Sequence, residues 1–152
     1  MLIGDLTTSG AMPAAEMLLK FAGQRQKIIA HNMANIDTPN FQPKNVDPKG
    51  FQKMLGDAID LRRKKTGGAF GVLEWKETRE IRRVGRFGGA GMDFELRPTT
   101  SGGGILHHDR NDRDLERMMQ EMVENATAYR VAADLLRTQR SQLRNAIAQR
   151  VV

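Results

Sequence analysis

The stretch LERMMQEMVENATAYRVAADLLRTQRSQLRNAI, residues 115–147, carries the clearest structural signal in this sequence. Large side chains return at every seventh position, and these are Leu115, Met122, Tyr129, Leu136 and Leu143. A second seam position is supplied mostly by Met119, Ala126, Ala133 and Ile147, with Arg140 interrupting it. A seven-residue apolar repeat is typical of a helix that packs lengthwise against another helix.

The same pattern predicts a single long helix at the C-terminal end of the sequence. No Gly or Pro occurs between Asn111 and Val152. Asn111 is suited to cap the helix, with Asp112 and Asp114 in the first turn, where carboxylates are favourable. A helix of about 38 residues would be about 57 Å long. Small residues such as Ala132 allow a second helix to approach closely, and the expected partners are the N-terminal helix and then other copies of the chain.

The first helix is predicted within residues 1–35. Pro13 suits an early helical position, because its missing N–H is not needed there. Side chains recur from that point in alternating steps of four and three, forming a stripe of Ala14, Leu18, Phe21, Arg25, Ile28, Asn32 and Asn35. Asn on such a stripe costs stability but can fix the register between helices. The helix should end shortly before Pro39, which disfavours helical geometry at Thr38.

The block NMANIDTPNFQPKN, residues 32–45, follows this helix and is unusually rich in polar and turn-forming residues. Its asparagines can both donate and accept hydrogen bonds. Asp37 and Thr38 can bond to nearby backbone, and Pro39 stiffens the chain. The block therefore predicts a specific turn where the chain leaves the first helix.

Residues 45–110 form a heterogeneous middle region. An amphipathic helix is predicted at 48–64, beginning after Asp47-Pro48 and ending at the glycines that follow Thr66. Two short strands are predicted at 70–75 and 78–84. The glycine-rich segments 85–93 and 99–104 are expected to be mobile in an isolated subunit. The chain thus divides into residues 1–44, 45–110 and 111–152.

The overall composition describes one domain with a modest and unevenly distributed core. The chain has 152 residues, 39% of them hydrophobic, and a formal net charge of +6. It has no Cys, so disulfides and thiolate chemistry are excluded. No apolar run approaches the length of a membrane span. The first residues lack the basic and apolar segments of a cleavable secretory signal, so export would need another route.

The candidates for chemistry are few. His107 and His108 are adjacent, which is not a metal-ligand spacing, and His31 has no obvious companion. Motifs for nucleophilic catalysis, phosphate binding or dinucleotide binding are missing from the sequence. We therefore predict no catalytic residue, no cofactor, no metal and no enzyme activity. A basic coiled coil that binds nucleic acid through residues 62–65 and the last helix is the alternative, although its charges mostly alternate in sign.

The segment ANIDTPNF, residues 34–41, resembles the Ala-Asn-x-x-Thr-Pro-Gly-Tyr signature of bacterial flagellar axial proteins, which are rod, hook and hook-associated proteins. Residues 24–33 resemble the first helix of that family, and residues 111–116 and 122–130 are similar to its proximal-rod members. Asn40 stands where the family usually has Gly, and Phe41 where it has Tyr. Asn is the best non-glycine residue for a positive φ, so the turn can be retained.

The resemblance implies a mainly α fold in which the N- and C-terminal helices form an antiparallel coiled-coil hairpin. It also implies that the hairpins of many subunits pack into the inner tube of the flagellar basal-body rod, with the turn block where the first helix leaves that layer. The implied function is structural. The subunit would be exported by the flagellar type III apparatus, would self-assemble in the periplasmic rod, and would be required for motility. Implied partners are other copies, the rod adaptor FliE, the MS ring and other rod proteins. A rod member such as FlgC is the nearest alternative within the family.

The expected mechanism couples folding to assembly. A single hairpin buries too little apolar surface to offset the ordering of its chain, so the end segments should be weakly ordered in a free subunit. The residues expected at subunit interfaces are Leu18, Phe21, Ile28, Asn32, Asn35, Thr38, Pro39, Phe41, Leu115, Met119, Met122, Tyr129, Leu136 and Leu143.

Overall fold

The computed structural model describes residues 10–67, 71–84, 93–100 and 114–149. Their elements, in chain order, are α2 (Met12–Ala34), β1 (Lys44–Asn45), α3 (Pro48–Thr66), β2 (Ile81–Arg83), β3 (Phe94–Leu96), β4 (Thr99–Thr100) and α4 (Leu115–Gln149). The predicted mainly α fold with long terminal helices is confirmed, and the short strands all lie in or beside the middle region.

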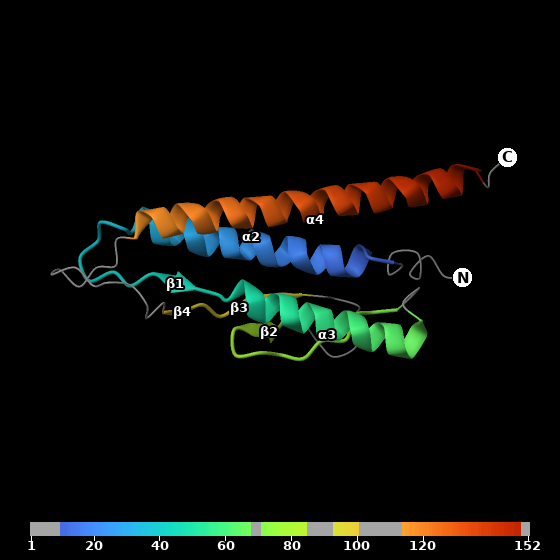
Figure 1. Cartoon of the computed structure of the whole chain (residues 1–152), viewed down its shortest axis with the longest axis horizontal. Coiled ribbons are helices and arrows are strands. Elements are labelled where there is room, and N and C mark those ends of the chain that lie inside the picture. Colours follow the sequence, from blue (N-terminus) through green and yellow to red (C-terminus); the bar gives the residue numbers. More distant parts are fainter. Residues whose placement is uncertain (1–9, 68–70, 85–92, 101–113, 150–152) are drawn as a thin grey trace.

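Helices α2 and α4 lie side by side and run in opposite directions (Figure 1). Near the start of α2, Gly10 lies beside Gln139. Farther along, the side chain of Asn125 reaches the backbone of Ala22. The partner positions therefore fall along α4 as the positions along α2 rise, and this confirms the antiparallel hairpin.

α2 is buried on two faces, because it lies between α4 and the layer formed by α3 and the strands (Figure 1). Its face toward α4 contributes Met12 and Ala15, which cluster with Leu136. Its other face contributes Met17 and Phe21 to the main core. The predicted stripe of Leu18, Phe21 and Ile28 belongs to this second face, so it packs mainly against the middle region and not against the last helix.

The main core is built on aromatic rings. Phe21 of α2 stacks on Phe51 of α3, with ring centroids 4.0 Å apart and planes 9° from parallel. Phe94 tilts against Phe51 at 6.2 Å, and Trp75 meets Phe94 edge-on at 6.0 Å. The remaining buried members of this core are Met17, Val46, Met54, Ala58, Leu73, Ile81 and Leu96. The middle region thus contributes most of the core of the protein.

α3 begins and ends as its sequence predicts. The Asp47 carboxylate accepts hydrogen bonds from the N–H groups of Lys49 and Gly50, and Pro48 occupies the first turn. These contacts satisfy donors that lack a partner at a helix N-terminus. Gly67 ends the helix with φ 67, a left-handed conformation that glycine adopts without strain. The predicted helix at 48–64 is confirmed, and it extends two residues further.

The strands form two short antiparallel pairs, β1 with β4 and β2 with β3. The strand predicted at 78–84 is confirmed at Ile81–Arg83. The strand predicted at 70–75 is wrong, since residues 71–75 are irregular. Leu73 and Trp75 are nevertheless buried, so the alternating pattern there reports contact with the core and not sheet pairing. Phe70 and most of the two glycine-rich segments lie outside the described residues.

The side chain of Gln24 attaches the β2–β3 pair to α2. Its Nε2 donates to the carbonyl of Phe94 at 2.7 Å, and its Oε1 accepts from the N–H of Leu96 at 3.0 Å. One amide therefore satisfies a donor and an acceptor on the edge of β3, much as a neighbouring strand would. Lys20 reinforces the attachment through an ion pair with Asp93 at 2.7 Å.

The seam between α2 and α4 uses a heptad position one residue earlier than the sequence pattern predicts. Met118, Asn125 and Ala132 are buried, seven residues apart, whereas Met119 remains 49% exposed. The fixed point is Asn125, whose Nδ2 donates to the carbonyl of Ala22 at 2.9 Å and to Gln26 Oε1 at 2.8 Å. This polar contact turns the helix so that the row of Met119, Ala126, Ala133 and Ile147 lies beside the seam.

The start of α4 also differs in detail from the prediction. The helix begins at Leu115, and Asp114 Oδ1 accepts from the N–H of Arg117 at 3.0 Å, as a capping residue does. Asp114 therefore has the role that the sequence pattern gave to Asn111. Asn111 itself lies outside the described residues.

Removing one ring of the stack tests the main core. We expect Phe51→Ala to lower the free energy of unfolding by about 3–5 kcal/mol, because it leaves a cavity among aromatic side chains. Leu61→Ala, at a 40% exposed position of the same helix, is the matched control and should cost about 1 kcal/mol or less. Denaturant unfolding followed by circular dichroism measures both, and equal losses would contradict a core centred on Phe51.

The polar contact in the hairpin gives a second test. Asn125→Ala should lower the free energy of unfolding by about 1–3 kcal/mol, because Gln26 Oε1 loses its donor inside the seam. Asn145→Ala changes the same residue type at an exposed site on the same helix and should stay within about 0.5 kcal/mol of wild type. If both variants match wild type, Asn125 does not hold the hairpin.

Candidate assembly interface

The turn block begins in the last turn of α2, which ends at Ala34. The chain then makes successive turns, in which the N–H of Thr38 donates to the carbonyl of Asn35 at 3.0 Å and that of Phe41 to the carbonyl of Thr38 at 3.2 Å. Asn40 has φ 60, so it adopts the left-handed conformation that was expected at the position of the family glycine. This part of the expectation is confirmed.

Asn32 holds the base of the turn block. It is only 4% exposed, its Nδ2 donates to the carbonyl of Lys44 at 2.6 Å, and its Oδ1 accepts from the N–H of Lys44 at 3.1 Å. Asn35 Nδ2 donates to the carbonyl of His31 at 2.8 Å, and the His31 ring lies edge-on to Phe41. These asparagines therefore bond within the chain, whereas the exposed Thr38 and Pro39 form the surface of the block.

A buried ion pair lies where the turn block, α2 and α4 meet. Arg25 is 4% exposed, and its Nη2 lies 3.7 Å from Glu121 Oε2. Asn45, the last residue of the turn block, donates from Nδ2 to Glu121 Oε1 at 3.1 Å. Glu121 therefore joins three segments that are far apart in the sequence. Such a pair is a poor source of net stability, but losing one partner leaves a buried charge, so it penalises other arrangements of the helices.

The sequence pattern placed Arg25 on a helix stripe but gave it no partner. Glu121 was not singled out among the acidic residues of the last helix. Asn125 was missed as well, although it sits seven residues from Met118 and from Ala132. A polar residue between two apolar members of a heptad row is the signal that could have identified it.

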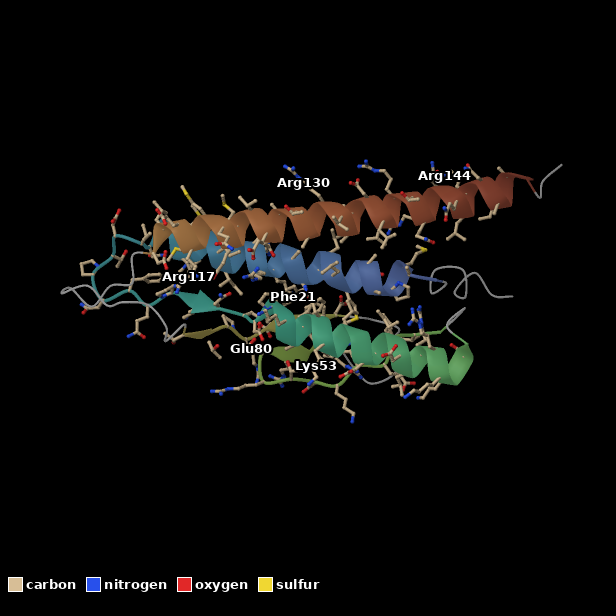
Figure 2. All side chains as sticks on the ribbon, in the orientation of Figure 1. Phe21, Lys53, Glu80, Arg117, Arg130 and Arg144 are labelled. Atoms are coloured by element: carbon tan, nitrogen blue, oxygen red, sulfur yellow. The ribbon has the colours of Figure 1, made fainter. Side chains whose placement is uncertain are left out.

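Among the described residues, seven of the ten exposed large hydrophobic side chains lie on α4 and form its outward surface. α2 covers only one face of this helix, and large hydrophobic side chains remain exposed along the rest of it. Val123 is 62% exposed and Val131 59% exposed. The others on α4 are Leu115, Met119, Tyr129, Leu135 and Ile147. Figure 2 shows Arg130 on the outer edge of the same helix, pointing away from α2.

A groove follows the junction of α2 and α4 toward the C-terminal end of α4. Its volume is about 470 Å³. Leu19 of α2 and Ala133 and Leu136 of α4 supply its apolar lining. The polar lining comes from Arg137, Arg140, Ser141 and Arg144. The groove thus combines an apolar floor with a strongly basic rim.

The predicted interface residues fall into three groups by exposure. Phe21, Asn32 and Leu136 are buried inside the chain. Leu18, Ile28, Asn35, Phe41, Met122 and Leu143 are partly buried. Thr38, Pro39, Leu115, Met119 and Tyr129 are exposed. Only the last two groups can touch another subunit without a change in the fold, and their role at an interface stays a prediction.

The described residues offer little for other kinds of site. They contain no cluster of three His, Asp or Glu side chains that could hold a metal, and His107 and His108 lie outside them. Within the basic run at residues 62–65, Arg62 is buried and donates to the carbonyl of Gly10, and Lys65 pairs with Glu74 at 2.5 Å. The run is therefore not an open basic patch. Among all the described residues, no helix has the length and apolar character that a membrane span needs.

Comparison with known proteins agrees with this geometry. Residues 19–42, which include the end of α2 and most of the turn block, match the family described as flagella basal body rod protein. The chain is also 26% identical over 126 residues to the flagellar basal body rod protein FlgB of Bacillus subtilis strain 168, a match that covers 83% of this chain and 84% of that protein. The signature turn, the antiparallel terminal helices and these two matches together support a FlgB-like flagellar basal body rod protein.

Proposed function

We propose that this chain is a structural subunit of the flagellar basal-body rod that assembles with copies of itself and with other rod proteins through the outward surface of α4. The observation that carries the proposal is the contrast between the two terminal helices. α2 is buried on two faces, whereas α4 is covered on one face and exposes large apolar side chains over the rest of its 35 residues. Exposed apolar surface of this extent marks an interaction site.

The packing between α2 and α4 explains how such a subunit can fold alone and still depend on its neighbours. The contact between α2 and α4 relies on small residues, such as Ala15, Ala22 and Ala132, and it includes polar side chains. Small side chains bury little apolar surface, so each turn of α4 gains little free energy from α2. We infer that α4 becomes fully ordered only when neighbouring subunits cover its outward surface.

The sequence predicted that both ends of the free subunit are weakly ordered, whereas we now propose this for the C-terminal helix alone. Phe21 and Met17 tie α2 into the main core, where they are 3% and 0% exposed. The partner-dependent part of the described chain is therefore α4. Coupling the ordering of one helix to binding lowers the affinity of each contact but links correct folding to correct assembly.

The remaining parts of the proposal come from the family. As a rod subunit, the chain would be exported by the flagellar type III apparatus and would act in the periplasmic part of the basal body. Its neighbours would include the adaptor FliE, the MS ring and rod proteins such as FlgC. The exposed turn at Thr38 and Pro39 and the outward surface of α4 are available for these contacts.

One substitution separates export from incorporation. Leu136→Asp places a carboxylate at a 7% exposed position of the α2–α4 contact, so we expect the hairpin to be lost. Cells that carry this variant in place of the wild-type gene should be non-motile in soft agar, and the variant should be missing from purified basal bodies. Because export needs no folded hairpin, the variant should still be detected outside the cytoplasm.

Thr138→Asp is the matched control, since it adds the same charge at an exposed position two residues along the helix. It should support motility and enter basal bodies. Normal motility of the Leu136→Asp strain would contradict the role of the hairpin, and a motile strain from which the whole gene is deleted would contradict the proposed function.

A further inference from the structure

The charges of α4 are divided along its length. From residue 114 to residue 124, four carboxylates accompany a single Arg. From residue 130 to residue 149, four Arg accompany a single Asp. The first part is therefore acidic and the second part basic, although the sequence as a whole shows mixed charge.

Helix-dipole effects do not account for this division. Acidic residues near the start of a helix and basic residues near its end are favourable, but the effect falls off within one turn. Glu124 lies nine residues beyond Leu115, and Arg137 lies twelve residues before Gln149. Their placement therefore needs a different physical reason.

The acidic part of α4 has an uncovered apolar edge. Leu115, Met119 and Val123 are spaced four residues apart, so they follow one side of the helix, and they are 43%, 49% and 62% exposed. Glu116 and Glu124 are exposed, and each directly follows a member of this row, so both lie on the same side of it. We call these five residues the acidic edge.

The groove between α2 and α4 has the complementary properties. Leu19, Ala133 and Leu136 form its apolar floor, and Arg137, Arg140 and Arg144 surround it. Arg137 has an ion pair with Asp134 at 3.7 Å, but both side chains are more than 70% exposed, so the pair contributes little and can be exchanged for another. We call these six residues the basic groove.

We propose that the acidic edge of one subunit binds in the basic groove of a second copy of this chain. The apolar edge would cover the groove floor while the two Glu side chains meet the Arg side chains. Burial removes water from both sides and strengthens the charge contacts. This contact specifies the self-assembly surface within the proposed function and rests on it.

The geometry of the contact determines the kind of assembly. The centres of the two surfaces are about 20 residues apart along α4, so successive subunits with parallel α4 helices would be displaced by about 30 Å along the helix axis. Each copy has one acidic edge and one basic groove, and these are different surfaces. Such a heterologous contact leaves a free surface at each end and can repeat without closing, as a rod requires.

Charge reversal tests the pairing directly. The groove variant is Arg137→Glu with Arg144→Glu, and the edge variant is Glu116→Lys with Glu124→Lys. Sedimentation velocity at low salt should show association of the wild-type protein, and each variant alone should associate at least tenfold more weakly. An equal mixture of the two variants should associate again, because every contact in the mixture can pair opposite charges.

The control is Arg63→Glu with Lys64→Glu, which makes the same change in charge at exposed positions of α3, and it should associate like wild type. If each charge-reversed variant by itself associates as strongly as wild type, the proposed pairing is wrong, although self-assembly itself would still be supported. Loss of association that the mixture fails to restore would also overturn it. A wild-type protein that stays monomeric would overturn both the pairing and the proposed self-assembly.

A cross-link provides an independent measurement, because the chain has no Cys of its own. One protein carries Val123→Cys and the other carries Ser141→Cys, with different tags. Oxidation of the mixture should give a disulfide between the two tagged chains. Gln142→Cys, on the next residue and therefore directed away from the groove, should give at least fivefold less, and equal yields from the two positions would contradict the contact.

Discussion

The burial of α2 on two faces is the constraint on which the rest of the structure depends. One face stacks Phe21 on Phe51 and so holds α3 and the short strands. The other face receives α4, with Asn125 bonded to the backbone of Ala22. Because α2 supports both layers, the main core fixes the position of the surface on which α4 packs. α4 can therefore form a second layer without a large core of its own.

Polar side chains supply the specificity of this arrangement. Asn125 fixes how α4 is turned and shifted against α2, and the Arg25–Glu121 pair with Asn45 fixes where the turn block returns to the hairpin. Asn32 closes the block on itself through Lys44. Apolar packing between small side chains would tolerate several registers, whereas a buried amide or charge penalises all but one. The outward surface of α4 then faces a constant direction, which a regular assembly requires.

The sequence predicted the features that local chemistry determines. Asp47-Pro48 and Gly67 gave the bounds of α3, and the seven-residue repeat gave the length of α4. It did not predict that the stripe of Phe21 packs on the middle region, because periodicity shows that a face is apolar and not what covers it. Only β2 was predicted among the strands, because β1, β3 and β4 are too short to stand out in the sequence. Gln24, and not a long sheet, holds β3 in place. The interface candidates were chosen by the same periodicity, which is why Met119 was counted in the seam while Asn125 was missed.

Native-state hydrogen exchange on the monomeric protein is the most direct measurement of the central claim that the core supports α2 while α4 depends on its neighbours. The account predicts that amides of α2 and α3 exchange only through global unfolding, whereas amides of α4 exchange through a separate opening of lower free energy. Equal protection of α4 and α2 in the monomer would contradict it, because α4 would then need no other subunit to be ordered.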